Sequence, residues 1–297
     1  MTRTLRAIIL FILLIATILF AGTILSYPIY LLFSLFSEVT LHKAVHYSIV
    51  LTALGLSIYY LKTNKETNKL YGLARQRNPF MQSFLFGAVI LLTVELCLYV
   101  FGMRQIDPDL ADGSGAFILT MIKALVSGLL VGIIEETTYR GASISGLKKY
   151  SDVVTAIIAS STLYAAVHFI NFAEIPKQTN IKVFTSLQIL GDGFYNFTDP
   201  LIIDSFITLF LLGTLLSLVR IHSNSLIPCI GLHAGIVTVN KIMSYSTDYK
   251  AGSPYDFLVN AYDRLNGWLA SICLLVAIFI YYKFFINRTV KSDSSNS

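Results

Sequence analysis

Apolar residues stand in long continuous blocks along the chain, and short polar stretches separate the blocks. A helix needs roughly 20 apolar residues to cross the hydrocarbon core of a bilayer, whereas the strands of a membrane barrel alternate in polarity. Eight blocks approach the helical length: 7–36, 43–61, 80–102, 116–147, 152–170, 201–219, 226–243 and 265–286. The pattern therefore predicts an all-α, polytopic membrane protein with a bundle of about eight transmembrane helices.

The composition agrees with this prediction. Of the 297 residues, 55% are hydrophobic and 13% are charged, whereas a soluble domain carries about 25% charged residues. These values exclude a soluble enzyme, a disordered protein and a secreted disulfide scaffold. No polar linker divides the blocks, so we expect a single membrane domain over residues 1–297, and we expect Cys97, Cys229 and Cys273 to be free thiols. The first block lacks a clear cleavage site and is expected to be a retained helix.

The lysines and arginines fall unevenly on the two sides that eight spans define. With a cytoplasmic N-terminus, the cytoplasmic side receives Arg3, Arg6, Lys62, Lys65, Lys69, Arg75, Arg77, Arg140, Lys148, Lys149, Arg220, Lys283, Arg288 and Lys291. The other side receives Lys43, Arg104, Lys177, Lys182, Lys250 and Arg264. The positive-inside rule therefore predicts that both termini are cytoplasmic. The net charge of +5 reflects this topology and not nucleic-acid binding, because no nucleic-acid motif joins the charges.

Ionisable residues inside membrane spans are costly, so they indicate function unless a structural partner explains them. We expect Glu95 and Lys123, both in the outer halves of neighbouring spans, to form a structural ion pair. Asp204 and Lys241 lie near span ends, where helix capping or snorkelling is a sufficient explanation. The residues that need a functional explanation are Glu135, Glu136, His168 and His233.

The two adjacent glutamates are expected to have different roles. Glu135 and Glu136 project about 100° apart on a helix, so they cannot face the same point. Glu136 precedes Arg140 by four residues, which is the favourable order for an ion pair on a helix. We therefore expect Arg140 to neutralise Glu136, which leaves Glu135 available as a general base.

The two histidines lie on separate predicted helices. His168 ends the fifth span, one turn after Tyr164 on the same face. His233 lies in the seventh span between Gly231 and Gly235, which form a small face that allows another helix to approach closely. By depth along the helices, His168 can meet the glutamates, whereas His233 joins them only if its span starts deep in the membrane or enters through a re-entrant segment.

Three motifs occur in order along the chain: Glu135-Glu136-x-x-x-Arg140, Tyr164-x-x-x-His168, and His233. This ordered set resembles the CAAX protease and bacteriocin-processing family of intramembrane proteases, which includes the type II CAAX prenyl endopeptidases. The resemblance places a catalytic core at about residues 116–243. It implies a helical bundle around a cavity that opens toward the cytoplasm.

The resemblance also implies roles for the residues of the motifs. Glu135 would activate the water that attacks the peptide bond, with Glu136 and Arg140 as its structural partners. His168 would orient the water or stabilise the oxyanion, and His233 would help it.

Two positions depart from the family pattern. Tyr164 stands where Phe is usual, which conserves the shape of the side chain. The third motif often reads His-x-x-x-Asn, and here the last place is Val237. Asn240, a supporting residue in our hypothesis, lies on the same face as His233 but about 10 Å along the axis. The usual amide donor to the oxyanion is thus absent or relocated, which leaves the activity and its substrate open.

The chemistry expected is hydrolysis of a peptide bond in a membrane-associated substrate, either a prenylated CAAX protein or a bacteriocin-like peptide. A metal-free mechanism without a cofactor is favoured, because HExxH is absent and the three residues come from separate helices. A zinc ion held by Glu135, His168 and His233 is the competing account. Covalent catalysis is disfavoured, because no GxSxG elbow occurs and no cysteine lies beside a candidate base.

The expected partners are a peptide or protein substrate and membrane lipids, with no nucleic acid. In a bacterium the protein would lie in the inner membrane. Two other classes of function stay open at this point. A scaffold that keeps the family fold without activity is favoured by Val237, and a proton-coupled transporter is disfavoured by the lack of internal repeats.

Overall fold

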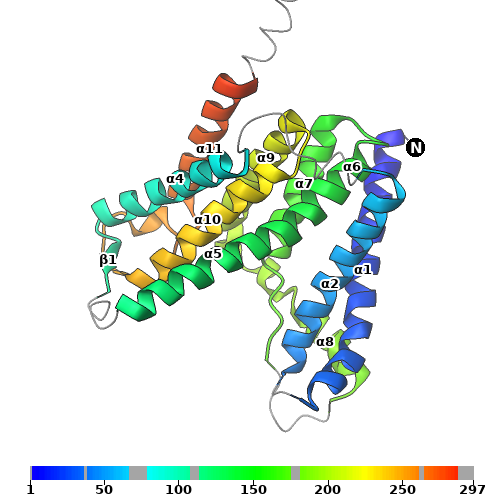
Figure 1. Cartoon of the computed structure of the whole chain (residues 1–297). Helices are drawn as coiled ribbons and strands as arrows, with labels where there is room; N and C mark the ends of the chain where they lie inside the picture. Colours follow the sequence, from blue (N-terminus) through cyan, green and yellow to red (C-terminus); the bar gives the residue numbers. More distant parts are fainter. Residues whose placement is uncertain are drawn as a thin grey trace, which may run out of the picture. The chain divides into compact units, whose positions relative to one another are not determined.

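The computed structural model describes residues 2–36, 39–66, 79–107, 114–174, 181–260 and 264–286. Its main elements are α1 (Arg3–Phe33), α2 (Leu41–Thr63), α4 (Pro79–Val100), β1 (Arg104–Ile106), α5 (Ser114–Glu136), the π-helix η2 (Thr137–Ser143), α6 (Ile144–Leu147), α7 (Val153–Val167), α8 (Val183–Asp192), α9 (Ile203–Ser223), α10 (Ile227–Ser246), β2 (Thr247–Tyr249) and α11 (Trp268–Tyr281) (Figure 1). Short helices complete the order: η3 (Tyr195–Thr198), η4 (Pro200–Ile202), η5 (Asp256–Leu258) and η6 (Tyr282–Ile286). The predicted all-α fold is confirmed.

Each predicted block corresponds to a helix of the structure. Among the described residues, six helices are long and apolar enough to cross a membrane: Arg3–Phe33, Leu41–Thr63, Pro79–Val100, Gly115–Lys148, Pro200–Ser223 and Ile227–Ser246. The remaining two blocks form the shorter apolar helices Val153–Val167 and Trp268–Phe284. The chain is therefore a polytopic membrane protein, and the cytoplasmic position of both termini stays a prediction. Several charges used for that prediction lie outside the described residues: Lys69, Arg75, Arg77, Lys177, Arg288 and Lys291.

The chain forms two compact units. Unit 1 comprises Met1–Glu66 and Thr137–Ile202, and unit 2 comprises Thr67–Glu136 and Ile203–Ser297. The chain therefore crosses from one unit to the other more than once. A single membrane domain over residues 1–297 stays a prediction, because one domain can contain two compact units.

In unit 1, α1 and α2 pack side by side, and α8 lies against both (Figure 1). Gly22 allows the close approach of α1 and α2, because a Cβ there would lie 2.7 Å from the Cα of Ile49. The hydroxyl of Ser26 donates a hydrogen bond to that of Ser186 across 3.1 Å, which joins α1 to α8. The small core between these helices contains Leu41, Val45, Ile49 and Ile189.

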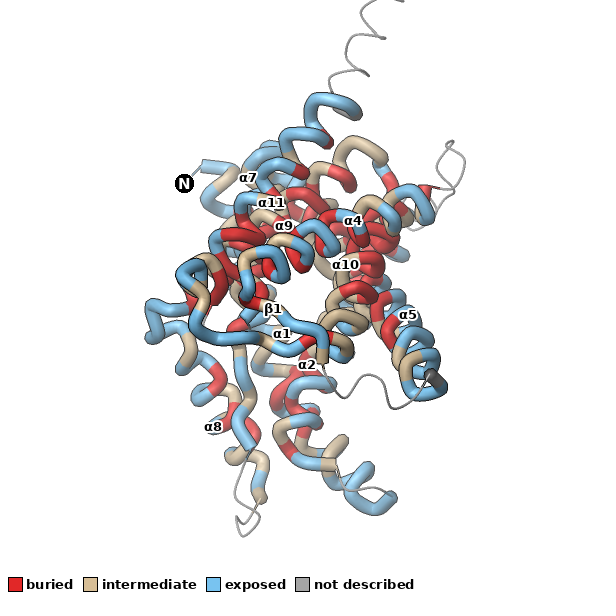
Figure 2. The backbone as a smooth tube through the Cα atoms, turned by 90° about the vertical axis from the view of Figure 1, so that its left-hand side faces the viewer, coloured by how far each residue is buried: buried red, intermediate tan, exposed pale blue. Residues whose placement is uncertain are grey.

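In unit 2, α10 lies between α4 and α5, and it is the most extensively buried stretch of the three (Figure 2). Gly231 and Gly235 face the carbonyl oxygens of Phe80 and Phe84 on α4, where any Cβ would overlap the backbone. The predicted small face of α10 is thus confirmed, and α4 is the helix that it receives. Gly87 of α4 makes the equivalent close approach to α10.

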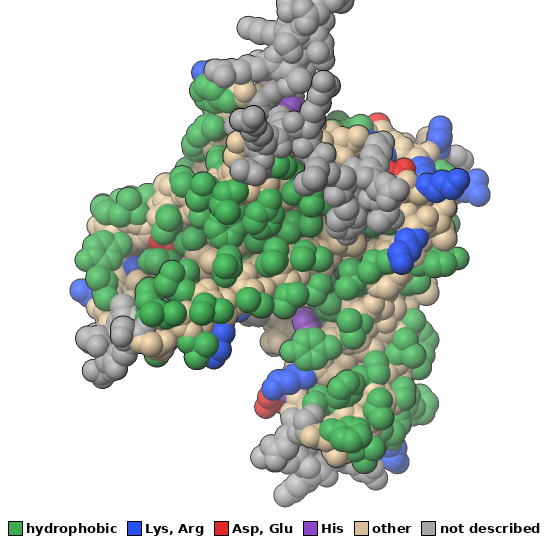
Figure 3. Space-filling model, in the orientation of Figure 1, with side chains coloured by type: hydrophobic (Ala, Val, Ile, Leu, Met, Phe, Trp, Pro, Cys, Tyr) green, Lys and Arg blue, Asp and Glu red, His purple; other side chains and the backbone are tan. Residues whose placement is uncertain are grey.

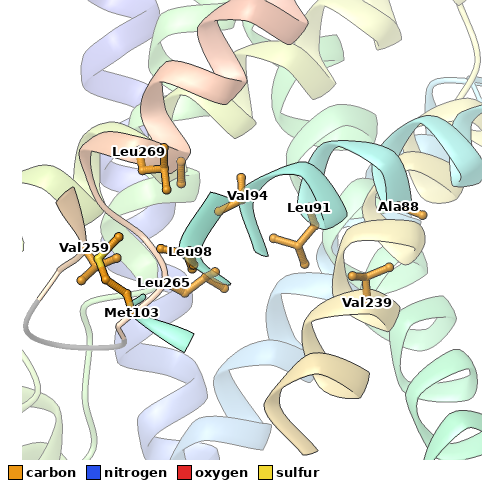
Figure 4. Close-up of a cluster of buried hydrophobic side chains, with 10 residues drawn as sticks. Ala88, Leu91, Val94, Leu98, Met103, Val239, Val259, Leu265 and Leu269 are labelled. Atoms are coloured by element: carbon orange, nitrogen blue, oxygen red, sulfur yellow. The ribbon is translucent and has the colours of Figure 1, made fainter. Parts of the chain in front are cut away.

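A hydrophobic core in unit 2 joins α4, α10 and α11 with the segments that connect them. Ala88, Leu91, Val94 and Leu98 extend along one face of α4 toward Leu269 of α11 (Figure 4). The antiparallel pair β1–β2, with Arg104 opposite Tyr249, links the ends of α4 and α10. This core holds α4 and α10 in fixed register.

The predicted ion pair between Glu95 and Lys123 is wrong. The buried carboxylate of Glu95 instead lies 3.3 Å from the guanidinium Nε of Arg104, which β1 brings back against the end of α4. The side chain of Lys123 is exposed on α5. The chain reversal after α4, which hydropathy does not reveal, decided this partner.

Asp204 lies in the first turn of α9, in agreement with the capping that we expected. Its carboxylate accepts hydrogen bonds from the backbone N–H of Ser205 and from the side-chain amide of Asn260. Lys241 is exposed on α10.

Candidate active site

The spacing of small residues on α5 determines which glutamate faces α10. Within residues 115–136 of this helix, the buried residues are Ala124, Gly128, Gly132 and Glu136, at intervals of four. A Cβ on Gly128 would lie 2.8 Å from the carbonyl oxygen of Ala234, so the two helix backbones are nearly in contact there. This close packing directs Glu136, at the end of the stripe, toward α10.

Glu136 and His233 form a buried pair. The carboxylate oxygen Oε1 of Glu136 lies 2.9 Å from Nδ1 of His233, and the side chain of Glu136 is 0% exposed. An ionised carboxylate only accepts hydrogen bonds, so Nδ1 carries the proton and donates it. Glu136 therefore fixes the orientation of the His233 imidazole. The other polar atom of this ring, Nε2, faces away from Glu136.

Glu135 lies on the opposite side of the same imidazole. Its Oε2 is 3.9 Å from Nε2 of His233, too far for a direct hydrogen bond. The side chain of Glu135 is 25% exposed, in contrast to its neighbour. The two adjacent glutamates thus face different nitrogens of the His233 ring. The side chain of Glu136 is buried, and that of Glu135 is more exposed.

The helix changes its geometry immediately after this pair. From Thr137 to Ser143 the chain forms the π-helix η2, in which hydrogen bonds span five residues instead of four. The four-residue geometry that we assumed for Glu136 and Arg140 is that of an α-helix and does not describe this stretch. Their pairing would join the two units and stays a prediction.

Unit 1 places Arg140 against two aromatic rings. The guanidinium of Arg140 is fully buried and lies 4.4 Å from the ring centroid of Tyr164 and 5.8 Å from that of Tyr139. The two tyrosine rings contact each other edge to face at 5.4 Å. The hydroxyl of Ser160 donates a hydrogen bond to the carbonyl of Tyr139, which ties α7 to η2. This geometry is that of a cation–π interaction, favoured where water is excluded.

His168 extends this cluster toward the surface of unit 1. It is the exposed C-cap of α7, with its ring centroid 4.7 Å from that of Tyr164. Its Nδ1 lies 2.6 Å from the carbonyl oxygen of Tyr164, and a carbonyl can only accept. Nδ1 therefore carries a proton, and the neutral ring presents Nε2 as an acceptor.

The predicted site residues thus fall into two groups. Glu135, Glu136 and His233 come together in unit 2, whereas Arg140, Tyr164 and His168 come together in unit 1. The convergence of all three proposed catalytic residues stays a prediction. Asn240, the supporting residue, lies two turns along α10 and accepts a weak hydrogen bond from the hydroxyl of Ser244.

Two contacts among the candidate site residues were not predicted from the sequence. The first is the bond between Glu136 and His233. The stripe of small residues at 124, 128 and 132 is a sequence signal that Glu136 lies on the packed side of its helix, although it does not identify the partner. Tyr139 was not singled out, although its place beside Arg140 in the first motif puts an aromatic ring next to a buried cation. Within each unit, the described residues contain no group of three or more His, Cys, Asp or Glu side chains arranged to hold a metal ion.

Unit 1 also contains an open pocket of about 590 Å³. The residues that line it are Asn171, Ala173, Gly191, Asp192, Phe194, Tyr195, Asn196 and Thr198. None of these lining residues is a predicted site residue. Two of them, Asp192 and Tyr195, have ionisable side chains.

Residues 117–239 match the family model described as Type II CAAX prenyl endopeptidase Rce1-like. The matched segment contains both glutamates, both histidines and Tyr164. Neither a curated protein nor a solved structure matches the chain. The family match confirms the resemblance that the three motifs indicate.

Proposed function

We propose that this chain, which carries an Rce1-like domain of the type II CAAX prenyl endopeptidase family at residues 117–239, is an intramembrane endopeptidase in which Glu135 activates a water molecule. The family supports a membrane protease of the CAAX type that acts on a peptide or protein. The glutamate mechanism, the substrate and the bacterial inner-membrane location are the proposal.

One observation carries the mechanism: His233 stands between the two glutamates. Its Nδ1 is bonded to buried Glu136, and its Nε2 lies 3.9 Å from Oε2 of the more open Glu135. An oxygen atom at about 2.8 Å from both Nε2 and Oε2 fits this separation. A water held there would have a carboxylate as base on one side and an imidazole on the other.

The residues can then divide the steps of hydrolysis. Glu135 takes a proton from the water as it attacks the carbonyl carbon, and later delivers that proton to the leaving amine. In this proposal His233 takes up a second proton, at Nε2, from solvent before the attack, and the carboxylate of Glu136 stabilises the resulting imidazolium. Its Nε2–H then donates a hydrogen bond to the developing oxyanion. This donor takes the place of the side-chain amide that the family's usual Asn would supply at position 237, where this chain has Val237.

His168 is the third catalytic residue that the family resemblance implies. Its Nδ1 is committed to the carbonyl of Tyr164, so the neutral ring offers only the Nε2 lone pair. In that state it orients the water by accepting a hydrogen bond.

A zinc mechanism is the second candidate, and the pair of Glu136 and His233 is the observation that favours it. Metal-bound histidines commonly donate their other ring N–H to a carboxylate. Glu135 Oε2 and His233 Nε2 would be two ligands, and His168 the third. A bound zinc would polarise the peptide carbonyl and acidify the attacking water.

The experiment uses the full-length protein in detergent and a panel of quenched fluorescent peptides, prenylated and unprenylated, with and without a chelator. We expect Glu135→Gln to lower kcat about 10²- to 10⁴-fold, because it removes the base. Glu174→Gln, which changes an exposed glutamate of unit 1, is the matched control and should leave kcat within about twofold.

Each outcome assigns a mechanism. Cleavage that is lost in Glu135→Gln and insensitive to chelator supports the glutamate mechanism, and the preferred peptide identifies the substrate class. Cleavage that is abolished by chelator and restored by zinc replaces it with the metal mechanism. Full activity of Glu135→Gln overturns both the glutamate mechanism and the metal mechanism. If no peptide is cleaved and proton-coupled uptake occurs in proteoliposomes, the protein is a transporter; if neither occurs, the inactive scaffold is favoured.

A further inference from the structure

Six basic side chains from three distant segments gather at one end of unit 1. Arg3 and Arg6 lie in the first turn of α1. Lys62 lies in the last turn of α2, and Lys65 follows that helix. Lys148 and Lys149 follow α6. All six are exposed, and Figure 3 shows Lys and Arg side chains gathered at this end of the unit. We call this surface the basic end of unit 1.

Contacts between the segments give the basic end a defined structure. The guanidinium of Arg3 donates a hydrogen bond to the backbone carbonyl of Lys149 at 2.6 Å. The ammonium of Lys149 donates to the side-chain oxygen of Asn64 and lies 5.2 Å from the ring centroid of Tyr60. The ends of α1, α2 and α6 are therefore tied together, although they are far apart in the sequence.

The positive charge of this surface is only partly compensated. Within residues 2–6, 60–66 and 146–152, the acidic side chains are Glu66 and Asp152. The carboxylate of Asp152 is already engaged as the N-cap of α7, where it accepts hydrogen bonds from Thr155. The basic end thus has more cations than local carboxylates, so it carries a net positive charge that favours an anionic partner.

The position of the basic end indicates the kind of partner. It coincides with the start of the apolar helix α1 and the end of the apolar helix α2, which is where spans leave the hydrocarbon. The exposed tyrosines Tyr59 and Tyr150 accompany the cations, and tyrosine is enriched at the headgroup level of membranes. The anionic groups at that level are lipid phosphates.

We propose that the basic end of unit 1 binds the phosphates of anionic lipid headgroups and selects them over zwitterionic ones. This binding is independent of the proposed peptidase activity. Arg3 and Arg6 lie on one face of α1, so one headgroup can contact both. The interaction is electrostatic, and it weakens as the salt concentration rises.

The test uses the full-length protein in detergent with dioleoyl-phosphatidylglycerol or dioleoyl-phosphatidylcholine as probe, and native mass spectrometry counts the bound lipid. The variant R6Q/K62Q removes two exposed cations. We expect it to bind phosphatidylglycerol about 30-fold more weakly than the unchanged chain, with no change for phosphatidylcholine. A second variant, R3Q/K149Q, should lose at least as much affinity for phosphatidylglycerol.

The matched control is K43Q/K182Q, which removes two exposed lysines of the same unit near the start of α2 and of α8. It should keep its affinity for phosphatidylglycerol. Equal losses in R6Q/K62Q and K43Q/K182Q, or equal binding of both lipids by the unchanged chain, overturns the proposal. Competition by millimolar inorganic phosphate would also overturn it, because the ligand would then be a soluble anion.

Discussion

At the scale of single residues, two neighbouring glutamates face different nitrogens of the same His233 ring and differ in their exposure to solvent. Glu136 is 0% exposed and bonded to Nδ1 of His233, whereas Glu135 is 25% exposed and faces Nε2. A buried carboxylate needs a partner to offset its desolvation, and the imidazole N–H supplies one. The Glu135 side chain is more exposed as a whole, but its Oε2 is buried and has no hydrogen-bond partner among the described residues, so it can accept a hydrogen bond from a water or a substrate group.

This division of roles predicts the effect of Glu136→Gln. The amide keeps an acceptor for Nδ1 but loses the charge that stabilises a protonated His233. We expect kcat to fall about 10²- to 10⁴-fold, measured with the best peptide of the panel.

The control for Glu136→Gln is Glu174→Gln, which makes the same change at an exposed glutamate outside the proposed site and should alter kcat less than about twofold. If Glu136→Gln is as active as the unchanged chain, Glu136 does not position the histidine. A thermal unfolding curve of each variant separates a catalytic loss from unfolding.

At the scale of elements, glycines set the distances at which the helices of unit 2 pack. Gly231 and Gly235 on α10 face backbone oxygens of α4, and Gly128 and Gly132 on α5 face α10. Helices in membranes associate mainly by close packing of this kind, because lipid tails are as apolar as the side chains. The glycines therefore determine the position of His233 relative to both glutamates.

Gly235→Ala tests this packing. Its Cβ would overlap the carbonyl oxygen of Phe84, which is backbone and cannot turn aside. We expect a loss of about 1–3 kcal/mol in the free energy of unfolding and a lower thermal midpoint in detergent.

Gly55→Ala is the control for this substitution, because it lies in α2 and no neighbouring atom stands within 4 Å of its ideal Cβ. It should be neutral or stabilising by up to about 1 kcal/mol, since Ala favours a helix over Gly. Equal effects of the two substitutions would show that α4 and α10 tolerate a wider separation.

The N-terminus of α7, the helix that carries Tyr164 and His168, depends on Asp152. Hydrogen bonds from the side chain and backbone N–H of Thr155 hold the pKa of Asp152 below its usual value. Because the pKa of Asp152 is lower in the folded state, the cap makes its full contribution to the free energy of unfolding at pH values above the unfolded pKa of about 4. The contribution is lost as pH falls through the lower, folded pKa.

Asp152→Asn keeps the acceptor of the cap but does not titrate. We therefore expect the difference in thermal midpoint between the unchanged chain and Asp152→Asn to be largest near neutral pH and to shrink as pH falls below about 4. Midpoints of both proteins across this range measure the difference. A difference that stays constant with pH would mean that the charge of Asp152 does not contribute to the cap.

At the scale of the whole molecule, the distribution of charge predicts how the chain crosses the membrane. The excess of Lys and Arg on the side of Arg3 and Lys149 predicts that both termini are cytoplasmic. A reporter active only in the cytoplasm should therefore work when fused after Ser297 and fail when fused after Lys250. The reverse pattern, or activity at both positions, contradicts the predicted topology.

The eight helical blocks could be predicted from the sequence because a span depends on the local run of apolar residues. The same information did not show that α5 passes into a π-helix at Thr137, since no single residue there breaks the pattern. It also assigned the wrong partner to Glu95. Arg104 reaches Glu95 through a chain reversal that local hydropathy does not encode.

The sequence by itself determined the fold class, the order of the helices and the small face of α10, because each follows from residues close together along the chain. The tertiary structure alone decided which atoms meet. Glu136 faces His233 because three small residues bring α5 against α10, and that contact joins residues 97 positions apart. Side-chain partners at such separations depend on how helices pack, which is a property of the folded chain.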